Sequence, residues 1–308
     1  SALMLAWVAH QAGLPAGLLN VLNGPGPKVG DAMVRHPDIG KITFTGSTSV
    51  GRTIGALAGA ELKSVTLELG GKTGFMVFAD ADLERAADAL VFSAFNNAGQ
   101  TCTAGSRLLV EESVAGDFLK LVSARIERIR IGDPLDPETQ LGPAISSRHR
   151  DRVLARMAEA EKAGLVPLKT SCGQLPERGF FLAPTVYLDV DPQLAVAQEE
   201  IFGPLVTVST FRDEGEAIAI ANGTPYGLAT TAWTSDIYRA RRISRQAQTG
   251  IVWLNTAHSL HPGSPYGGYK QSGLGLEMGE EAIRQHMRIK TVWSEDGRWQ
   301  SPWAPAPE

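Results

Sequence analysis

A ten-residue stretch, "NNAGQTCTAG" at 96–105, places one of the two cysteines of the chain between two threonines. A cysteine of a hydrophobic core normally has Leu, Ile or Val as neighbours, and Cys102 has none. Two interpretations stay open, an inert thiol in an ordinary loop or a nucleophile that the loop presents. No histidine lies nearby in the sequence, so a base for the thiol would come from elsewhere in the fold. Cys172, in "KTSCGQLP", is predicted to be an inert thiol.

A carboxylate could reach a ligand from the stretch "VTLELGGK" at 65–72. Its alternation predicts a strand that carries Glu68 near its end, directly before two glycines. The carboxyl end of a parallel strand is where open α/β sheets bind ligands, and glycines allow backbone or ligand to come close. The alternative is a solvated Glu68 followed by a simple turn, and this stretch alone does not exclude it.

Two further stretches could bind parts of a nucleotide. "FTGSTSVG" at 44–51 runs from a strand into a helix, and such a turn points N–H groups at phosphate. Alternatively, Ser47 or Thr48 only caps the helix. The same region resembles a P-loop but has Arg52 in place of the phosphate-binding lysine. "QEEIFGP" at 198–204 offers two carboxylates, which could hold a diol such as ribose or only end a helix.

The composition is that of an ordinary globular protein. The chain has 308 residues, 43% of them hydrophobic and 20% charged, and a net charge of -4. Its Lys and Arg residues are scattered, which argues against nucleic-acid binding, and no apolar run approaches the roughly 20 residues of a membrane span. The two histidines of "HSLHPG" lack further Cys or His neighbours, so no metal site is predicted. Two distant cysteines favour a reducing, cytoplasmic location.

The apolar pattern alternates between strand and helix periods, which predicts an α/β fold. In the first seventy residues it predicts part of a doubly wound parallel sheet, with a helix at 1–12, strands at 17–24, 40–46 and 63–71, and a helix at 47–59. Ser1 either caps the first helix or is an internal start within a longer protein.

After Gly71 the alternation begins again, and we expect a second α/β domain joined to the first near Gly70-Gly71. Its predicted strands are 74–80, 106–112, 181–188, 204–210, 228–234 and 250–255. Its predicted helices are 82–99, 113–130, 147–163, 213–221 and 236–248, with a surface loop at 131–143. The tail from 294 is Pro-rich and expected to be irregular.

Taken in order and with their spacing, five motifs resemble the aldehyde dehydrogenase superfamily over all but about the last dozen residues. They are "FTGSTSVG", "LELGGK", "GQTCTAGSR" with its cysteine 34 residues after Glu68, "EEIFGP" and "NTAHSLHPGSPYGGYKQSG". The resemblance implies part of a Rossmann-like parallel-sheet cofactor domain at 1–70 and an α/β catalytic domain at 71–270. It also implies a C-terminal helix, oligomerisation strand and Pro-rich tail at 271–308.

The resemblance further implies NAD(P)-dependent oxidation of a small-molecule aldehyde to a carboxylic acid, through a cysteine thiohemiacetal and a thioester. Cys102 would be the nucleophile and Glu68 the general base. NAD or NADP would be bound by Gly46, Ser47, Leu69, Glu200 and Phe202. The substrate channel would include Thr101, Thr103, Asn255 and His258, and the stretch 256–262 would line its mouth.

The segment "RIKTVWS" at 288–294 resembles the strand through which subunits of this family pair, which implies a homodimer or homotetramer. The family also has about two more strands before the point that matches Ser1, with an asparagine that donates to the oxyanion, and an arginine where this chain has Leu276. Three alternatives remain: a truncated, non-catalytic oligomerisation or partner module, an enzyme that passes the thioester to coenzyme A, and a P-loop hydrolase. A hydrolytic base at Glu68 argues against the second, and Arg52 weakens the third.

Overall fold

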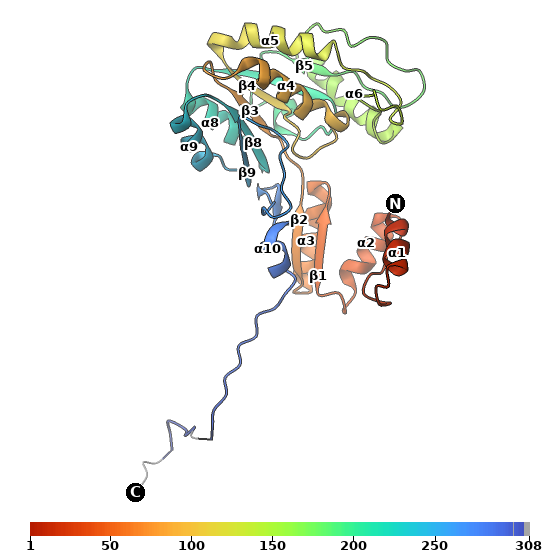
Figure 1. Cartoon of the computed structure of the whole chain (residues 1–308), viewed down its shortest axis with the longest axis vertical. Helices are drawn as coiled ribbons and strands as arrows, with labels where there is room; N and C mark the ends of the chain where they lie inside the picture. The colour runs from red at the N-terminus through yellow and green to blue at the C-terminus, as the bar shows by residue number, and fades with distance from the viewer. Residues whose placement is uncertain (298, 305–308) are drawn as a thin grey trace.

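The computed structural model describes residues 1–297 and 299–304, which form two main β-sheets with helices packed on them and one further sheet of two short strands (Figure 1). The larger sheet has the order β5-β6-β4-β3-β8-β9, and all neighbouring strands are parallel. The strands are β3 (Gly74–Val77), β4 (Arg107–Glu111), β5 (Thr185–Tyr187), β6 (Leu205–Phe211), β8 (Ala229–Trp233) and β9 (Ile251–Leu254). The predicted α/β fold is confirmed.

The larger sheet is wound in two directions from its centre. The chain runs from β3 to β4 and on to β5 at one edge, returns to place β6 between β5 and β4, and then crosses to the other side of β3 as β8 and β9. Its helices are α4 (Leu83–Phe95), α5 (Glu112–Ile126), α6 (Ser147–Lys162), α7 (Ala195–Gln198), α8 (Glu214–Asn222) and α9 (Ile237–Gln246). A doubly wound sheet was predicted for the first seventy residues, whereas the structure has this arrangement in the larger sheet after Gly71, where only an α/β domain was expected.

Both faces of the larger sheet are buried. In β3, Phe75 and Val77 pack with α4 and α5 on one face, whereas Met76 packs with α8 and α9 on the other. At one end of the sheet, α6 and α7 pack over β5 and β6. Burial on both faces explains why these strands could be recognised as continuous apolar runs.

The smaller sheet consists of β1 (Lys41–Thr45), its parallel neighbour β2 (Ser64–Glu68), and β11 (Gly273–Leu274), which runs antiparallel to β2. Helices α2 (Gly26–Arg35) and α3 (Thr48–Ala60) pack on it, while α1 (Ala2–Gln11) contributes no buried residue. In Figure 1 this sheet lies below the larger one, with β2 leading up into β3.

The strand predicted at 17–24 is wrong. These residues form turns and bends, and nearly all of them are exposed. A parallel strand exists only beside a hydrogen-bonded neighbour, and among the described residues β1 pairs with β2 alone. The Asn20 side chain instead donates to the Gly17 carbonyl oxygen at 2.8 Å, which closes a local turn.

The helix predicted at 82–99 ends earlier, at Phe95. The short turn η1 (Asn96–Gly99) follows, in which Asn97, Ala98 and Gly99 have φ angles of 52°, 55° and 69°. The Asn97 side chain donates to the Gln100 carbonyl, and the Gln100 side chain donates to the Asn97 carbonyl, both at 2.9 Å. This left-handed turn directs the chain into the loop that carries Cys102.

Three short C-terminal strands were not predicted, because two residues show no pattern, whereas the C-terminal helix that the resemblance implied is present. β7 (Tyr226–Gly227) pairs with β10 (Tyr269–Lys270), and α10 (Gly279–Arg284) follows β11. Residues 288–294 pair with no strand of the described chain and extend away from both sheets (Figure 1). The tail has no helix or strand at 294–297 and 299–304, while 298 and 305–308 lie outside the described residues.

Candidate active site

The candidate site lies between the two sheets. Glu68 is the last residue of β2, and the segment after it leads into the amino end of β3. The loop with Cys102 leads into the amino end of β4, which is the direct neighbour of β3. The two loops therefore lie side by side, so closely that a Cβ on Gly71 would be 2.2 Å from the Cys102 carbonyl oxygen. Only glycine fits at that position.

Backbone hydrogen bonds give the cysteine loop a fixed shape. The Ala104 N–H donates to the Thr101 carbonyl at 3.1 Å, and the Gly105 N–H donates to the Ser93 hydroxyl of α4 at 3.1 Å. The Arg107 N–H donates to the Thr73 carbonyl at 3.2 Å, which joins the loop to the start of β3. The thiol is thus presented by a tightly bonded turn.

The Cys102 thiol contacts a tyrosine. Its sulfur lies 3.3 Å from the Tyr266 hydroxyl oxygen. Burial raises the pKa of Cys102 above its usual value, the charges of Glu200 and Glu68 raise it further, and hydrogen bonds from Tyr266 and from the N–H of Cys102 itself oppose this shift. The resting thiol is therefore protonated at neutral pH. Sequence reasoning did not single out Tyr266.

Glu68 is a buried carboxyl group. It is 4% exposed, and neither oxygen has a hydrogen-bond partner within the described chain. Desolvation, followed by the charge of Glu277, raises its pKa to about 8. Glu277 comes close because its backbone exchanges two hydrogen bonds of 2.7 Å with Tyr266. The sequence offered no signal for this second carboxylate, which reaches the site through chain pairing alone.

The residues expected at the cofactor phosphates lie at the amino end of α3. The Gly46 N–H donates to the Glu68 carbonyl at 2.9 Å, so this turn adjoins Glu68. Ser47 is the N-cap of α3, and its hydroxyl accepts from the Val50 N–H at 3.5 Å. The side chain of Leu69 is buried against Gly51 of the same helix.

Glu200 lies against the two glycines that follow β2. One of its oxygens accepts a hydrogen bond from the Gly71 N–H at 3.1 Å. A Cβ on Gly70 would be 2.5 Å from the other. Burial raises the pKa of Glu200, and the Gly71 N–H with the charges of Lys72 and Arg152 opposes that shift. Glu200 therefore lies close to both Glu68 and Cys102.

Helix α6 holds the segment that carries Glu200 and Phe202. Phe202 has a φ of 61°, unusual for a residue with a side chain. Its carbonyl oxygen lies 2.7 Å from Nε2 of the buried His149, while Arg152 donates to Nδ1 of that ring at 2.8 Å. Because arginine can only donate, Nε2 carries the proton and donates to Phe202.

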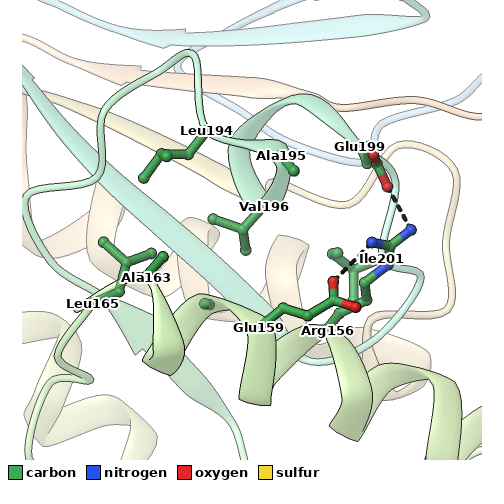
Figure 2. A pocket seen from close by; sticks show the side chains of 10 residues that line it. Arg156, Glu159, Ala163, Leu165, Leu194, Ala195, Val196, Glu199 and Ile201 are labelled. Atoms are coloured by element: carbon green, nitrogen blue, oxygen red, sulfur yellow. Dashed lines mark hydrogen bonds and ion pairs between the residues drawn. The ribbon is translucent and has the colours of Figure 1, made fainter.

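The same helix holds the other end of the segment (Figure 2). Arg156 pairs with Glu199 at 2.6 Å and with Glu159 at 2.8 Å. These charges border a small cavity of about 110 Å³ between α6 and α7, whose remaining lining is apolar. Glu200 is thus flanked by two contacts with one helix, at Glu199 and at Phe202.

Three of the four expected channel residues meet at the cysteine loop. Thr101 and Thr103 belong to the loop, and the His258 ring lies 3.2 Å from the Thr103 carbonyl oxygen, between Phe92 and Trp253. Burial lowers the pKa of His258.

The fourth, Asn255, follows the carboxyl end of β9. Its side chain accepts from the Thr234 N–H at 3.0 Å and donates to the Thr234 carbonyl at 2.9 Å. Because the cysteine loop leads into the amino end of β4, Asn255 lies at the opposite edge of the sheet.

Two buried cations behind Glu200 were not anticipated. Lys72 is 3% exposed, and its ammonium group has no hydrogen-bond partner among the described residues. Burial and the charge of Arg107 lower its pKa to about 7. Arg107 donates to the carbonyls of Lys72, Ile220 and Ala221 at 2.7 to 3.0 Å.

In the part of the chain that the structure describes, no cluster of three or more His, Cys, Asp or Glu could hold a metal. No described helix has the length and apolar character of a membrane span.

Comparison with known proteins identifies the family. The profile of the "Aldehyde dehydrogenase family" matches residues 1–292. An aldehyde dehydrogenase of Emericella nidulans is 44% identical over 95% of this chain and 59% of its own length. A betaine aldehyde dehydrogenase of Brucella ovis is 43% identical over 98% and 63%.

A solved structure gives the same result. The betaine aldehyde dehydrogenase of Staphylococcus aureus, in complex with NAD+, superimposes with a TM-score of 0.88 and 36% identity, over 92% of this chain and 56% of its own. The chain thus spans about three fifths of the length of the curated relatives it matches. It belongs to the aldehyde dehydrogenase family.

Proposed function

We propose that the protein oxidises an aldehyde to a carboxylic acid with NAD or NADP, using Cys102 as the nucleophile and Glu68 as the general base. One observation carries the proposal: Gly71, three residues after Glu68, donates its N–H to Glu200 at 3.1 Å and packs against the Cys102 carbonyl oxygen, so the proposed nucleophile, base and ribose ligand belong to one site. The names of the similar proteins, and the NAD+ in one of them, support the same substrate and cofactor classes.

The residues present fit the phosphate and nicotinamide-ribose part of a dinucleotide. Helix α3 has 13 residues, an N-cap at Ser47 and no acidic residue in its first turn, so its amino end favours an anion. Glu200 offers a carboxylate oxygen to a diol, and Gly46, Leu69 and Phe202 would complete the contact surface. When bound, the nicotinamide would accept the hydride that leaves the substrate carbon.

The first step is nucleophilic addition. The Cys102 thiol loses its proton, and the sulfur attacks the carbonyl carbon to give a thiohemiacetal oxyanion. The backbone N–H of Cys102, beside the reacting sulfur, would donate to the new oxyanion. Loss of hydride from the carbon then leaves a thioester on Cys102.

The second step is hydrolysis of that thioester. Glu68 takes a proton from a water molecule, which attacks the thioester carbonyl and releases the acid with the free thiol. With a pKa of about 8, Glu68 is a stronger base than an ordinary carboxylate once it is ionised. The small residues beside Cys102 leave space for cofactor and water to approach in turn. This hydrolytic base favours water over coenzyme A as the acceptor.

The domain division 1–70, 71–270 and 271–308 belongs to the same proposal, and so does a homodimer or homotetramer. Strand β11 belongs to the third part but pairs with β2, which belongs to the first part. Residues 288–294 would provide the pairing strand between subunits, because they have no partner strand among the described residues and could pair with another chain.

The test is to replace Cys102 by alanine in the complete natural protein, with Cys172→Ala as a matched control. Turnover of propanal with NAD+ and NADP+ should fall by at least about 10³-fold in the first variant and persist in the second. Equal turnover in the two variants would exclude Cys102 as the nucleophile. No turnover in the parent protein would favour the non-catalytic module.

A further inference from the structure

The Cys102 sulfur lies 3.3 Å from the Tyr266 hydroxyl oxygen. The two residues are 164 positions apart, yet the contact is well defined. Tyr266 is held by its two backbone hydrogen bonds with Glu277 and is partly buried. No role for this hydroxyl follows from the proposed steps of addition and hydrolysis.

The contact has a different strength in the two forms of the thiol. While sulfur carries its proton, either group can donate to the other. Once sulfur is ionised, only the tyrosine can donate, and the bond becomes charge-assisted and stronger. The hydroxyl therefore favours the thiolate over the thiol, and the thiolate is the form that attacks a carbonyl.

The carboxylate side chains around the sulfur disfavour its ionisation. Glu68 at the end of β2 and Glu200 after α7 place negative charge near it, and burial has the same effect. Lys72 acts on Glu200, and His258 is bound to the Thr103 carbonyl. Of the described side chains that act on the thiol, Tyr266 is therefore the group that favours the charged form.

We propose that Tyr266 is a catalytic residue of this site, whose hydroxyl donates a hydrogen bond to the Cys102 sulfur and stabilises the attacking thiolate. This inference rests on the proposed role of Cys102. The thiol proton passes to solvent, and the tyrosine keeps its own, because burial and the nearby charges of Cys102 and Glu68 raise the pKa of Tyr266. A phenylalanine would keep the ring but lose the donor.

The test is the pH dependence of Cys102 alkylation by iodoacetamide, read from the mass of the Cys102 peptide after brief pH jumps. In Tyr266→Phe, the inflection should rise by about one pH unit, and alkylation at neutral pH should slow about five- to tenfold. The two profiles should converge at the alkaline end, because a less stabilised thiolate is intrinsically at least as nucleophilic. Tyr269→Phe, at an exposed position of β10, should leave the profile unchanged.

Superimposable profiles for the parent and Tyr266→Phe would overturn the inference. So would an equal loss of rate at every pH, which would mean that the ring controls only access to the sulfur. A second measurement does not depend on the folding of the variant: meta-fluorotyrosine, a stronger donor, incorporated into the parent should lower the inflection, and an unchanged inflection counts against the inference. Neither experiment needs aldehyde or cofactor, so a failure of the proposed oxidation would be seen separately.

Discussion

The carboxyl group of Glu68 titrates far from its usual range because it is shielded from water and lies near Glu277. Its pKa is about 8 in the folded protein, against an ordinary value of 4.5 for a glutamate. Between these two pH values the folded state holds a proton that the unfolded chain releases. The stability that this proton provides is complete below pH 4.5 and is lost as the pH rises through about 8.

Glu68→Gln should remove that loss, because an amide does not ionise. Between acidic and alkaline pH, we expect the unfolding free energy of the parent to fall by about 2–4 kcal/mol relative to that of the variant. Urea unfolding at about pH 5 and pH 8.5 measures this difference. Glu61→Gln, at an exposed position, is the control. If the difference in unfolding free energy between Glu68→Gln and the parent is the same at both pH values, Glu68 ionises normally.

At the residue scale, the sequence led to Cys102 and Glu68 through the order and spacing of five motifs. It could not lead to Tyr266 or Glu277, because Tyr266 is 164 positions from Cys102 in the sequence and Glu277 reaches the site through its pairing with Tyr266. Their local patterns are those of ordinary loop residues. Lys72 was quoted within a motif, but the sequence did not indicate that its ammonium group would be buried near the charges of Arg107 and Glu200, without a hydrogen-bond partner among the described residues.

At the element scale, α6 positions the segment that carries Glu200. His149 and Arg156 lie on one side of the helix, seven positions apart, and hold Phe202 and Glu199. The hydrogen bond from His149 matters most, because the Phe202 backbone has a φ of 61° and its carbonyl oxygen is part-buried beside the His149 ring. An unsatisfied buried acceptor costs about 1–3 kcal/mol.

His149→Ala should therefore loosen residues 199–204, with amide hydrogen exchange there about tenfold faster. His149→Gln should restore protection, since its amide can donate to the Phe202 carbonyl. Hydrogen-exchange mass spectrometry on both variants reads this out, and His10→Ala, exposed on α1, is the control. Unchanged exchange in His149→Ala would refute the positioning role.

The strands of the larger sheet were predictable because both of their faces are buried, which leaves an apolar run in the sequence. The error at 17–24 arose because a strand also needs a neighbour, which a local pattern cannot show. The early end of α4 depends on a left-handed turn, which asparagine adopts readily and alanine does not. Strands of two residues such as β11 exist only through pairing, so no periodicity could have revealed them.

At the scale of the whole molecule, the C-terminal segment 288–294 is exposed and has no partner strand among the described residues. Ile289, Val292 and Trp293 are 101%, 78% and 92% exposed. Apolar exposure of this kind marks an interaction surface, in agreement with the proposed pairing of subunits.

Val292→Pro in the complete natural protein should weaken this pairing, because proline removes a donor from the strand. Light scattering should show a shift from an oligomer toward the mass of one chain. Glu295→Pro, just outside the segment, should leave the mass unchanged. An oligomer of the same mass in both variants would place the subunit contact elsewhere.

The central claim is that aldehyde oxidation passes through a thioester on Cys102 that Glu68 hydrolyses. The most direct measurement is peptide mass spectrometry of the complete natural protein with Glu68→Gln, after reaction with propanal and NAD+. We expect a propionyl group on the Cys102 peptide, at a much higher level than in the parent, because acylation continues while hydrolysis is slowed. A parent that turns over propanal, together with a variant whose Cys102 peptide carries no acyl group, would contradict the account.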